Sequence, residues 1–284
     1  MGHKSWYSVV AGVALLIIIP GRNALFAHLQ ETTAGNPEAR KVLNDGVEAY
    51  KRGRTDEAIE DFKKAKDLDP SLTNAQLFLA VAYSSQYVPG APSPENIRYG
   101  EQALEQFKEI LENHPSNLSA IDGAGAILYN MASTPYNLEK MEESKAYEKR
   151  HIEIRPDDPE PYYWIGVIDW SIVYRANKDL REEWMKQTSR DLQPADALPE
   201  EIRREFGSKY GDTVQEGIDS LKKAMTHRPD YDDAKAYLNL LYRQKADMES
   251  APILREDDLK TADDLVDQVK AHKEKELEQR EQPQ

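Results

Sequence analysis

Apolar and small side chains recur along most of this chain with the spacing of an α-helix. In the stretch 39–70 they include Ala58, Phe62 and Ala65, and Pro70 follows five residues after the last of them. Residues three and four apart lie on one face of a helix, and a proline cannot continue one. The pattern therefore predicts two helices joined by a turn at Gly53, the second of which ends at Pro70.

The same spacing returns three times further along the chain. The corresponding second helices contain Ala103, Phe107 and Ile110 before Pro115; Ser144, Glu148 and His151 before Pro156; and Gly217, Leu221 and Ala224 before Pro229. The first helices agree in turn, with Gly46, Ala80, Gly125, Gly166 and Asn239 in matching places. Small residues there allow two helices to approach closely, and internal repetition of this kind is typical of arrays whose units pack on their neighbours.

Gly46, Ala58, Phe62, Ala65 and Pro70 at these distances resemble the tetratricopeptide repeat, a helix–turn–helix unit of about 34 residues. The resemblance extends over about 39–273. It implies an all-α fold, a right-handed α-solenoid of about five helix–turn–helix repeats. The expected units are about 39–72, 73–117, 118–158, 159–231 and 232–273.

The units differ in length, because successive prolines are 45, 41 and 73 residues apart. The register places the extra residues between the paired helices, at about 87–98, 131–138, 171–210 and 247–256. Three prolines in the first insertion are expected to exclude a helix, and the second lengthens a turn. The third insertion is expected to form two short helices of its own, KDLREEWMKQ and PEEIRREF, separated by QPADALP. A polar tail, 274–284, ends the sequence.

The first residues have the layout of a secretory signal peptide. A charged start precedes the apolar run 6–19, Pro20-Gly21 breaks it, and the small residues Ala24 and Ala27 follow. The run is shorter than the roughly 20 residues that a membrane-spanning helix needs. We expect cleavage of 1–27 followed by a linker at 28–38, and hence a periplasmic or secreted protein. An uncleaved membrane anchor is the alternative.

Charge and residue usage narrow the classes of function. The net charge of −14 disfavours nucleic acid, whose phosphates require clustered Lys and Arg. The absence of cysteine excludes disulfides, thiolate catalysis and zinc–thiolate sites. The six histidines make no paired metal-ligand spacing, and no glycine-rich phosphate loop is present. No catalytic residue, metal or cofactor is predicted.

Surface recognition is the function that remains. The family resemblance implies that first helices line a concave groove and second helices form the convex back. Groove-facing candidates are then Asn44, Tyr50, Phe78, Tyr129, Asn130, Tyr163, Trp164 and Trp170. Aromatic side chains supply large contact areas at modest entropic cost, although each could instead fill the core between neighbouring helices.

The sequence therefore predicts an exported, non-enzymatic scaffold that binds a protein or peptide in its concave groove. Two alternatives stay open. Trp170, Tyr174 and Trp184 of the insertion 171–210 could form a small-molecule or glycan pocket, since stacked rings suit sugars and apolar ligands. The chain could also be a membrane-anchored assembly factor that keeps residues 1–27.

Overall fold

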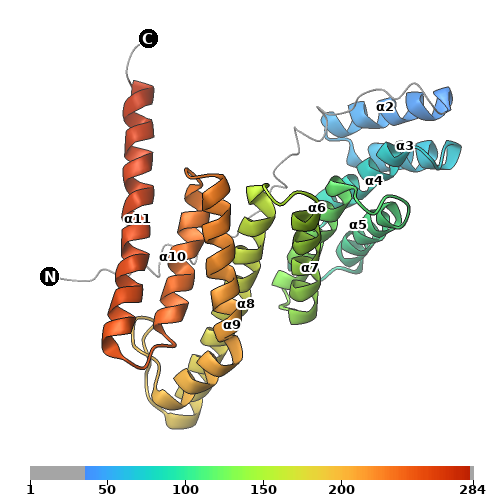
Figure 1. The fold of residues 1–284 in the computed structure, drawn as a ribbon. Coiled ribbons are helices and arrows are strands. Elements are labelled where there is room, and N and C mark those ends of the chain that lie inside the picture. Colours follow the sequence, from blue (N-terminus) through green and yellow to red (C-terminus); the bar gives the residue numbers. More distant parts are fainter. Residues whose placement is uncertain (1–35, 282–284) are drawn as a thin grey trace. The chain divides into compact units, whose positions relative to one another are not determined.

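A computed structural model describes residues 36–281 of the chain. The predicted signal segment 1–27, most of the linker and the end of the polar tail lie outside these residues. The described residues form ten helices and no strand, which confirms the predicted all-α fold (Figure 1). The helices fall into two compact units. We call residues 36–154 unit 1 and residues 155–281 unit 2.

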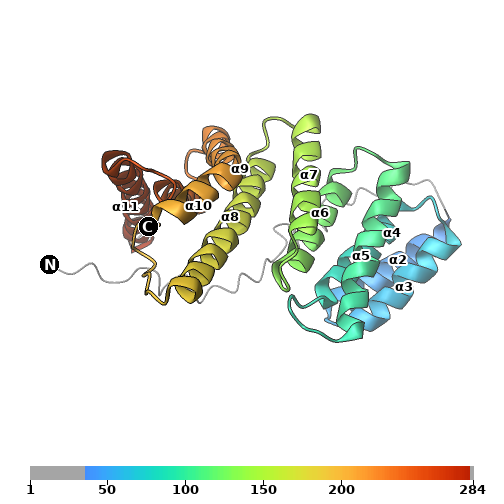
Figure 2. The same ribbon diagram turned by 90° about the horizontal axis from the view of Figure 1, so that it is seen from below.

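Unit 1 consists of three helix pairs. They are α2 (Pro37–Lys51) with α3 (Thr55–Leu68), α4 (Thr73–Gln86) with α5 (Pro94–Asn113), and α6 (Leu118–Ser133) with α7 (Leu138–Ile154). Each second helix also packs on the first helix of the next pair, as α3 does on α4 and α5 on α6. The first helices α2, α4 and α6 touch one another in turn and form one layer (Figures 1 and 2).

Close packing between neighbouring helices of unit 1 depends on glycine opposite phenylalanine, within a pair at Gly46 and between pairs at Gly123. A Cβ atom on Gly46 would lie 2.8 Å from the ring of Phe62, and one on Gly123 would lie 2.3 Å from the ring of Phe107. The Phe62 ring also stacks on Phe78 of the next pair, with ring centroids 5.6 Å apart. These contacts confirm the prediction that small residues allow neighbouring helices to approach closely.

Unit 2 consists of two longer pairs. They are α8 (Pro159–Thr188) with α9 (Glu200–His227), and α10 (Asp232–Ala246) with α11 (Pro252–Glu281). Close packing on a glycine also occurs in unit 2, because a Cβ atom on Gly166 would lie 2.3 Å from Leu221. Helix α10 packs on α8, α9 and α11 (Figure 2).

The prediction of two separate short helices in 171–210 is wrong. Both stretches are helical, but KDLREEWMKQ continues α8 and PEEIRREF begins α9, so only 189–199 connects the two. No proline lies between Pro161 and Pro194 to break α8. The added turns bury Trp184 and Phe206, which extends the apolar contact of the pair.

Prolines also start helices inside two of the predicted insertions. Helix α5 begins at Pro94 and α11 at Pro252, each within a stretch that was expected to be irregular. A proline fits the first turn of a helix because its missing N–H would be unpaired there anyway. Ser93 completes the start of α5 by accepting a hydrogen bond from Asn96 N at 3.1 Å. Within residues 36–281, no helix combines the length and apolar character needed to cross a bilayer.

Candidate protein-binding faces

The structure divides the predicted site residues of unit 1 into buried and accessible ones. Tyr50 is 7% exposed and Phe78 is 2% exposed, so both rings pack inside the unit. Asn44 on α2 is exposed, while Tyr129 and Asn130 at the end of α6 are half-buried. Only the last three therefore present side chains to a partner.

The face formed by the first helices α4 and α6 of unit 1 is nearly free of charge. Helices α4 and α6 contain a single charged residue, Asp122, although charged residues make up 31% of the whole chain. The accessible positions of this face are small or neutral polar residues: Asn74, Val81, Ser84, Ser85, Ser119, Ala126, Tyr129 and Asn130. A partner on this face would meet shape and neutral hydrogen-bonding groups, with little ionic attraction.

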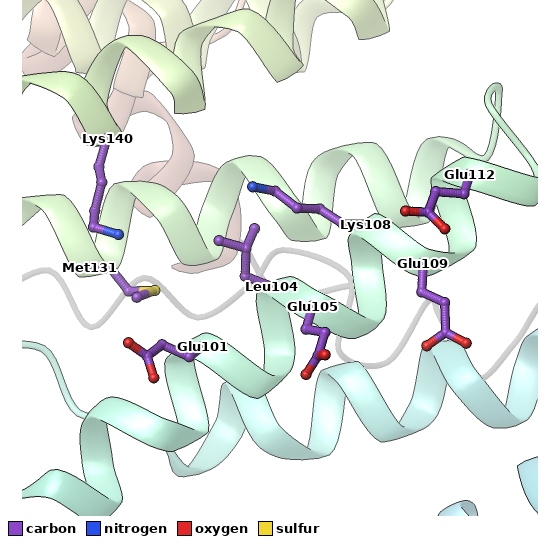
Figure 3. A pocket seen from close by; sticks show the side chains of 8 residues that line it. All are labelled: Glu101, Leu104, Glu105, Lys108, Glu109, Glu112, Met131 and Lys140. Atoms are coloured by element: carbon purple, nitrogen blue, oxygen red, sulfur yellow. The ribbon is translucent and has the colours of Figure 1, made fainter.

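The second helices of unit 1 carry the charges instead. Lys66 of α3 pairs with Glu109 of α5 at 2.7 Å, and Lys108 of α5 pairs with Glu143 of α7 at 2.7 Å. Figure 3 shows Glu109 and Lys108 projecting to opposite sides of α5, toward these two neighbours. They line an open, largely acidic hollow of about 470 Å³. This face is a solvated surface cross-linked by ion pairs, each of which adds little stability when exposed.

Unit 2 presents a cluster of aromatic rings on its first helices, which we call the aromatic patch: Tyr163, Trp164, Trp170, Tyr174 and Tyr237. Tyr163, Trp170 and Tyr174 are seven and four residues apart, so they share one face of α8. The Trp170 and Tyr174 rings stack, with centroids 5.1 Å apart and planes at 21°. Tyr237 of α10 meets the edge of Trp170 at 5.3 Å, which joins the two first helices of the unit.

The aromatic patch has a buried floor and an accessible rim. Tyr163 and Tyr237 are buried, Trp164 and Trp170 are half-buried, and Tyr174 is 46% exposed. Of the three predicted site residues in this unit, Tyr163 therefore serves packing, and Trp164 and Trp170 keep accessible surface. Exposed aromatic groups beside a packed aromatic floor are typical of the residues that dominate protein interfaces.

One end of the aromatic patch is fixed by a buried tyrosine. The Tyr231 ring lies 4.9 Å from that of Tyr163, and its hydroxyl donates to Glu160 at 2.9 Å. Burial, reinforced by the Glu160 carboxylate, raises the pKa of Tyr231 far above its ordinary value. Tyr231 is therefore a neutral donor at any physiological pH. Arg228 pairs with the same carboxylate at 2.8 Å and balances its charge.

The other end of the aromatic patch passes into a polar network around Arg181. The guanidinium is buried and donates to Asp247 at 2.8 Å and to Asn177 at 2.7 Å. It also donates to the carbonyl oxygens of Gln193 and Asp196, each at 3.0 Å. Arg181 thus ties the connection 189–199 to α8 and to the end of α10.

The structure does not bring together the three rings of the predicted glycan pocket. Trp184 is buried, and its Nε1 donates to Glu201 of α9 at 2.9 Å. It follows Tyr174 by ten residues, which is about 15 Å along a helix. Only the Trp170–Tyr174 pair remains accessible. Within the described part of the chain, no group of acidic or histidine side chains is placed to hold a metal ion.

Tyr237 is the member of the aromatic patch that sequence reasoning missed. Its partners Tyr163 and Trp170 were identified from the repeat register, and Tyr174 appeared only in the alternative pocket. The available signal was the helical spacing of Tyr163, Trp170 and Tyr174, which marks a stripe that needs an opposing helix. Nothing in the sequence of α10 shows which of its tyrosines meets that stripe.

No family model and no curated protein matches this chain. Solved structures do match. A MamA double mutant (RS-1) aligns with a TM-score of 0.55 and 15% identity over 86% of this chain and 98% of its own. MamA from residue 41 onward, from Desulfovibrio magneticus RS-1, aligns with a TM-score of 0.54 and 16% identity over 88% of this chain and 100% of its own. Another MamA crystal structure aligns with a TM-score of 0.50 and 15% identity over 79% of this chain and 92% of its own.

At such low identity these likenesses concern the fold alone. MamA is a tetratricopeptide-repeat protein, and the match covers most of both chains. Together with the five helix pairs, it shows that this chain has a tetratricopeptide-like helical-repeat fold.

Proposed function

We propose that this chain is a non-enzymatic scaffold that binds a protein or peptide segment on its first-helix faces. The aromatic patch of unit 2 is the main anchor, and the nearly uncharged face of α4 and α6 in unit 1 is a second candidate surface. The observation that carries this proposal is the accessible Trp170–Tyr174 stack on a buried aromatic floor. Helical-repeat proteins of this class use such faces for protein recognition.

The proposal includes export to the cell envelope. The signal-like residues 1–27 support it, with cleavage near Ala27 and a periplasmic or secreted mature chain. The alternative is an envelope assembly factor that keeps this segment as an anchor. Mass spectrometry of the amino terminus of the protein purified from its native envelope separates the two: a mature chain starting near residue 28 supports cleavage, and an intact residue 1 supports the anchored alternative.

Site-specific photocrosslinking tests the binding face. A photoreactive amino acid replaces Tyr174 or Asn130 on the first helices, and Glu105 on the second-helix side of unit 1 as the matched control. All three positions are accessible. We expect crosslinks to a protein from positions 174 and 130 in the native envelope, and none to the same protein from position 105.

The same experiment can overturn the proposed binding face. Crosslinking to one protein from position 105 but not from 174 or 130 would move the binding face to the second helices. A small molecule or glycan retained by the wild-type chain and lost with Trp170→Ala would favour the alternative binding function instead.

A further inference from the structure

The aromatic patch contains a hydrogen-bond donor that lacks an acceptor. Trp170 Nε1 is shielded from solvent and has no hydrogen-bond partner among residues 36–281. A buried N–H group without an acceptor is unfavourable, because it has given up its bonds to water and gained none in return. A ligand that brings a carbonyl oxygen to this atom would restore the missing bond.

The polar side chains that follow the patch along α8 and α10 are already engaged with one another. Arg175 pairs with Asp179 at 3.0 Å, and Asn177 donates to Gln244 at 2.8 Å and to Asp247 at 2.9 Å. A sugar needs several uncommitted polar groups beside a ring, and this surface offers few. It offers apolar ring faces, the Tyr174 hydroxyl and the indole donor of Trp170.

We propose that the aromatic patch binds a proline-rich segment in the polyproline II conformation. This inference rests on the proposed scaffold function and specifies the chemistry of the partner. Proline rings pack on Tyr and Trp faces, and the polyproline II backbone leaves its carbonyl oxygens free to accept hydrogen bonds. Proline has no backbone N–H, so such a segment brings acceptors without donors. Trp170 supplies the matching donor.

Binding requires a small rearrangement of the rim. Trp170 Nε1 is buried, so a neighbouring ring must shift before a carbonyl oxygen can reach it. Tyr174 stacks on Trp170 and is the most exposed ring of the patch, which makes it the ring with room to move. The hydrogen bond to Trp170 therefore forms on binding, between the indole and a proline-rich segment that Tyr174 covers from the other side.

Fluorescence anisotropy of a labelled decaproline peptide, titrated with the full-length chain, tests this inference. We expect saturable binding that Tyr174→Ala weakens by about tenfold or more, as loss of a central aromatic contact does. Tyr174→Phe keeps the ring and should stay within about twofold of the wild type. Trp170→Phe keeps a ring but removes the donor, and should weaken binding by roughly fivefold. Tyr210→Ala on the second helix α9, outside the first-helix faces, is the matched control and should leave decaproline binding unchanged.

The inference is overturned if decaproline binds no more tightly than a Gly-Ser peptide of equal length, or if Tyr174→Ala binds it as the wild type does. Equal binding by Trp170→Phe and the wild type would remove the role given to the indole donor. A partner crosslinked at position 174 through a segment without proline would overturn the proline preference and leave the scaffold function standing. Displacement of decaproline from position 174 by a linear oligosaccharide would assign the patch to sugars.

Discussion

The two units use the same first-helix layer in different ways. In unit 1 the accessible positions of the first helices α4 and α6 are mostly small or neutral, and neighbouring helices pack glycine against phenylalanine, as at Gly123 and Phe107. In unit 2 the corresponding positions are aromatic, and the first helices α8 and α10 are joined by rings and by the network around Arg181. The same repeat pattern thus presents a surface of small, neutral residues in unit 1 and an aromatic surface in unit 2.

The difference follows from helix length. The helices of unit 1 are 14 to 20 residues long. Helices α8 and α9 are 30 and 28 residues long and continue past the repeat, which leaves extra turns to be filled. Trp184, Asn177 and Arg181 occupy those turns and are buried. Specific side-chain chemistry is therefore concentrated where the chain departs from the regular repeat.

The largest expected effect comes from breaking the Arg181 network. Arg181→Met leaves Asp247 buried without its ionic partner and removes the guanidinium hydrogen bonds to the carbonyl oxygens of Gln193 and Asp196. Removing one member of a buried ion pair costs about 3–5 kcal/mol. Hydrogen exchange followed by mass spectrometry should show lost protection in 189–199 and at the end of α10, with unit 1 unchanged.

Arg204→Met is the control for that experiment. Arg204 pairs with Glu200 at 2.6 Å, but both side chains are largely exposed, so the change should cost at most about 1 kcal/mol. If Arg181→Met and Arg204→Met had similar effects, the buried network would not distinguish unit 2 from unit 1.

A middle-sized effect tests the packing of unit 1. Gly123→Ala places a Cβ atom 2.3 Å from the ring of Phe107, which is itself buried. Overpacking of this kind costs about 1–3 kcal/mol, despite the better helix propensity of alanine. Chemical denaturation should show a lower free energy of unfolding for this variant.

Gly211→Ala in α9 should raise the free energy of unfolding, opposite to the effect of Gly123→Ala. A Cβ atom there has no neighbour within 4 Å, so only helix propensity acts, and it favours alanine by up to about 1 kcal/mol. Destabilisation by both alanines would show that backbone flexibility, and not close packing, explains the glycines in these helices.

The sequence predicted the fold correctly where one kind of contact requires one type of residue. Gly46, Phe62 and Phe107 stand at repeated positions because neighbouring helices need small-against-large packing, so five pairs and their order could be predicted. It failed for 171–210, because helical length depends on whether a neighbouring helix covers the added turns. The starts of α5 and α11 were not predicted, because proline breaks a helix in its interior but is well tolerated in its first turn.

The site was predictable only in part, for a similar reason. The repeat register assigns residues to first helices, which correctly located Trp164, Trp170, Tyr129 and Asn130 on accessible positions. It does not say how deeply each ring is buried, since burial depends on the opposing helix. Phe78 and Tyr163 were therefore grouped with accessible residues, and Tyr237, which approaches from α10, was not identified.

The smallest expected effect concerns the last pair, where α11 is tied to the start of α10 by charge. Asp232 lies 2.6 Å from His272 Nδ1 and 3.0 Å from Lys235 Nζ. Burial acts to raise the pKa of Asp232, but the hydrogen bonds from His272 and Lys235 outweigh it and hold the pKa below its ordinary value. A carboxyl group with a lowered pKa in the folded state stabilises that state above its ordinary pKa, near 4, and the stabilisation is lost as the pH falls through the lowered value.

The end of α11 should therefore loosen from α10 only below about pH 4. Because the chain has no cysteine, cysteines introduced at the exposed positions Ala236 and Lys273 can carry the only two spin labels. Electron paramagnetic resonance should show a narrow distance distribution at pH 6 that broadens at pH 3. Asp232→Asn, which cannot ionise, should be broader already at pH 6 and change less between the two pH values. An equal pH response in both proteins would assign the loosening to other carboxylates of α10 and α11.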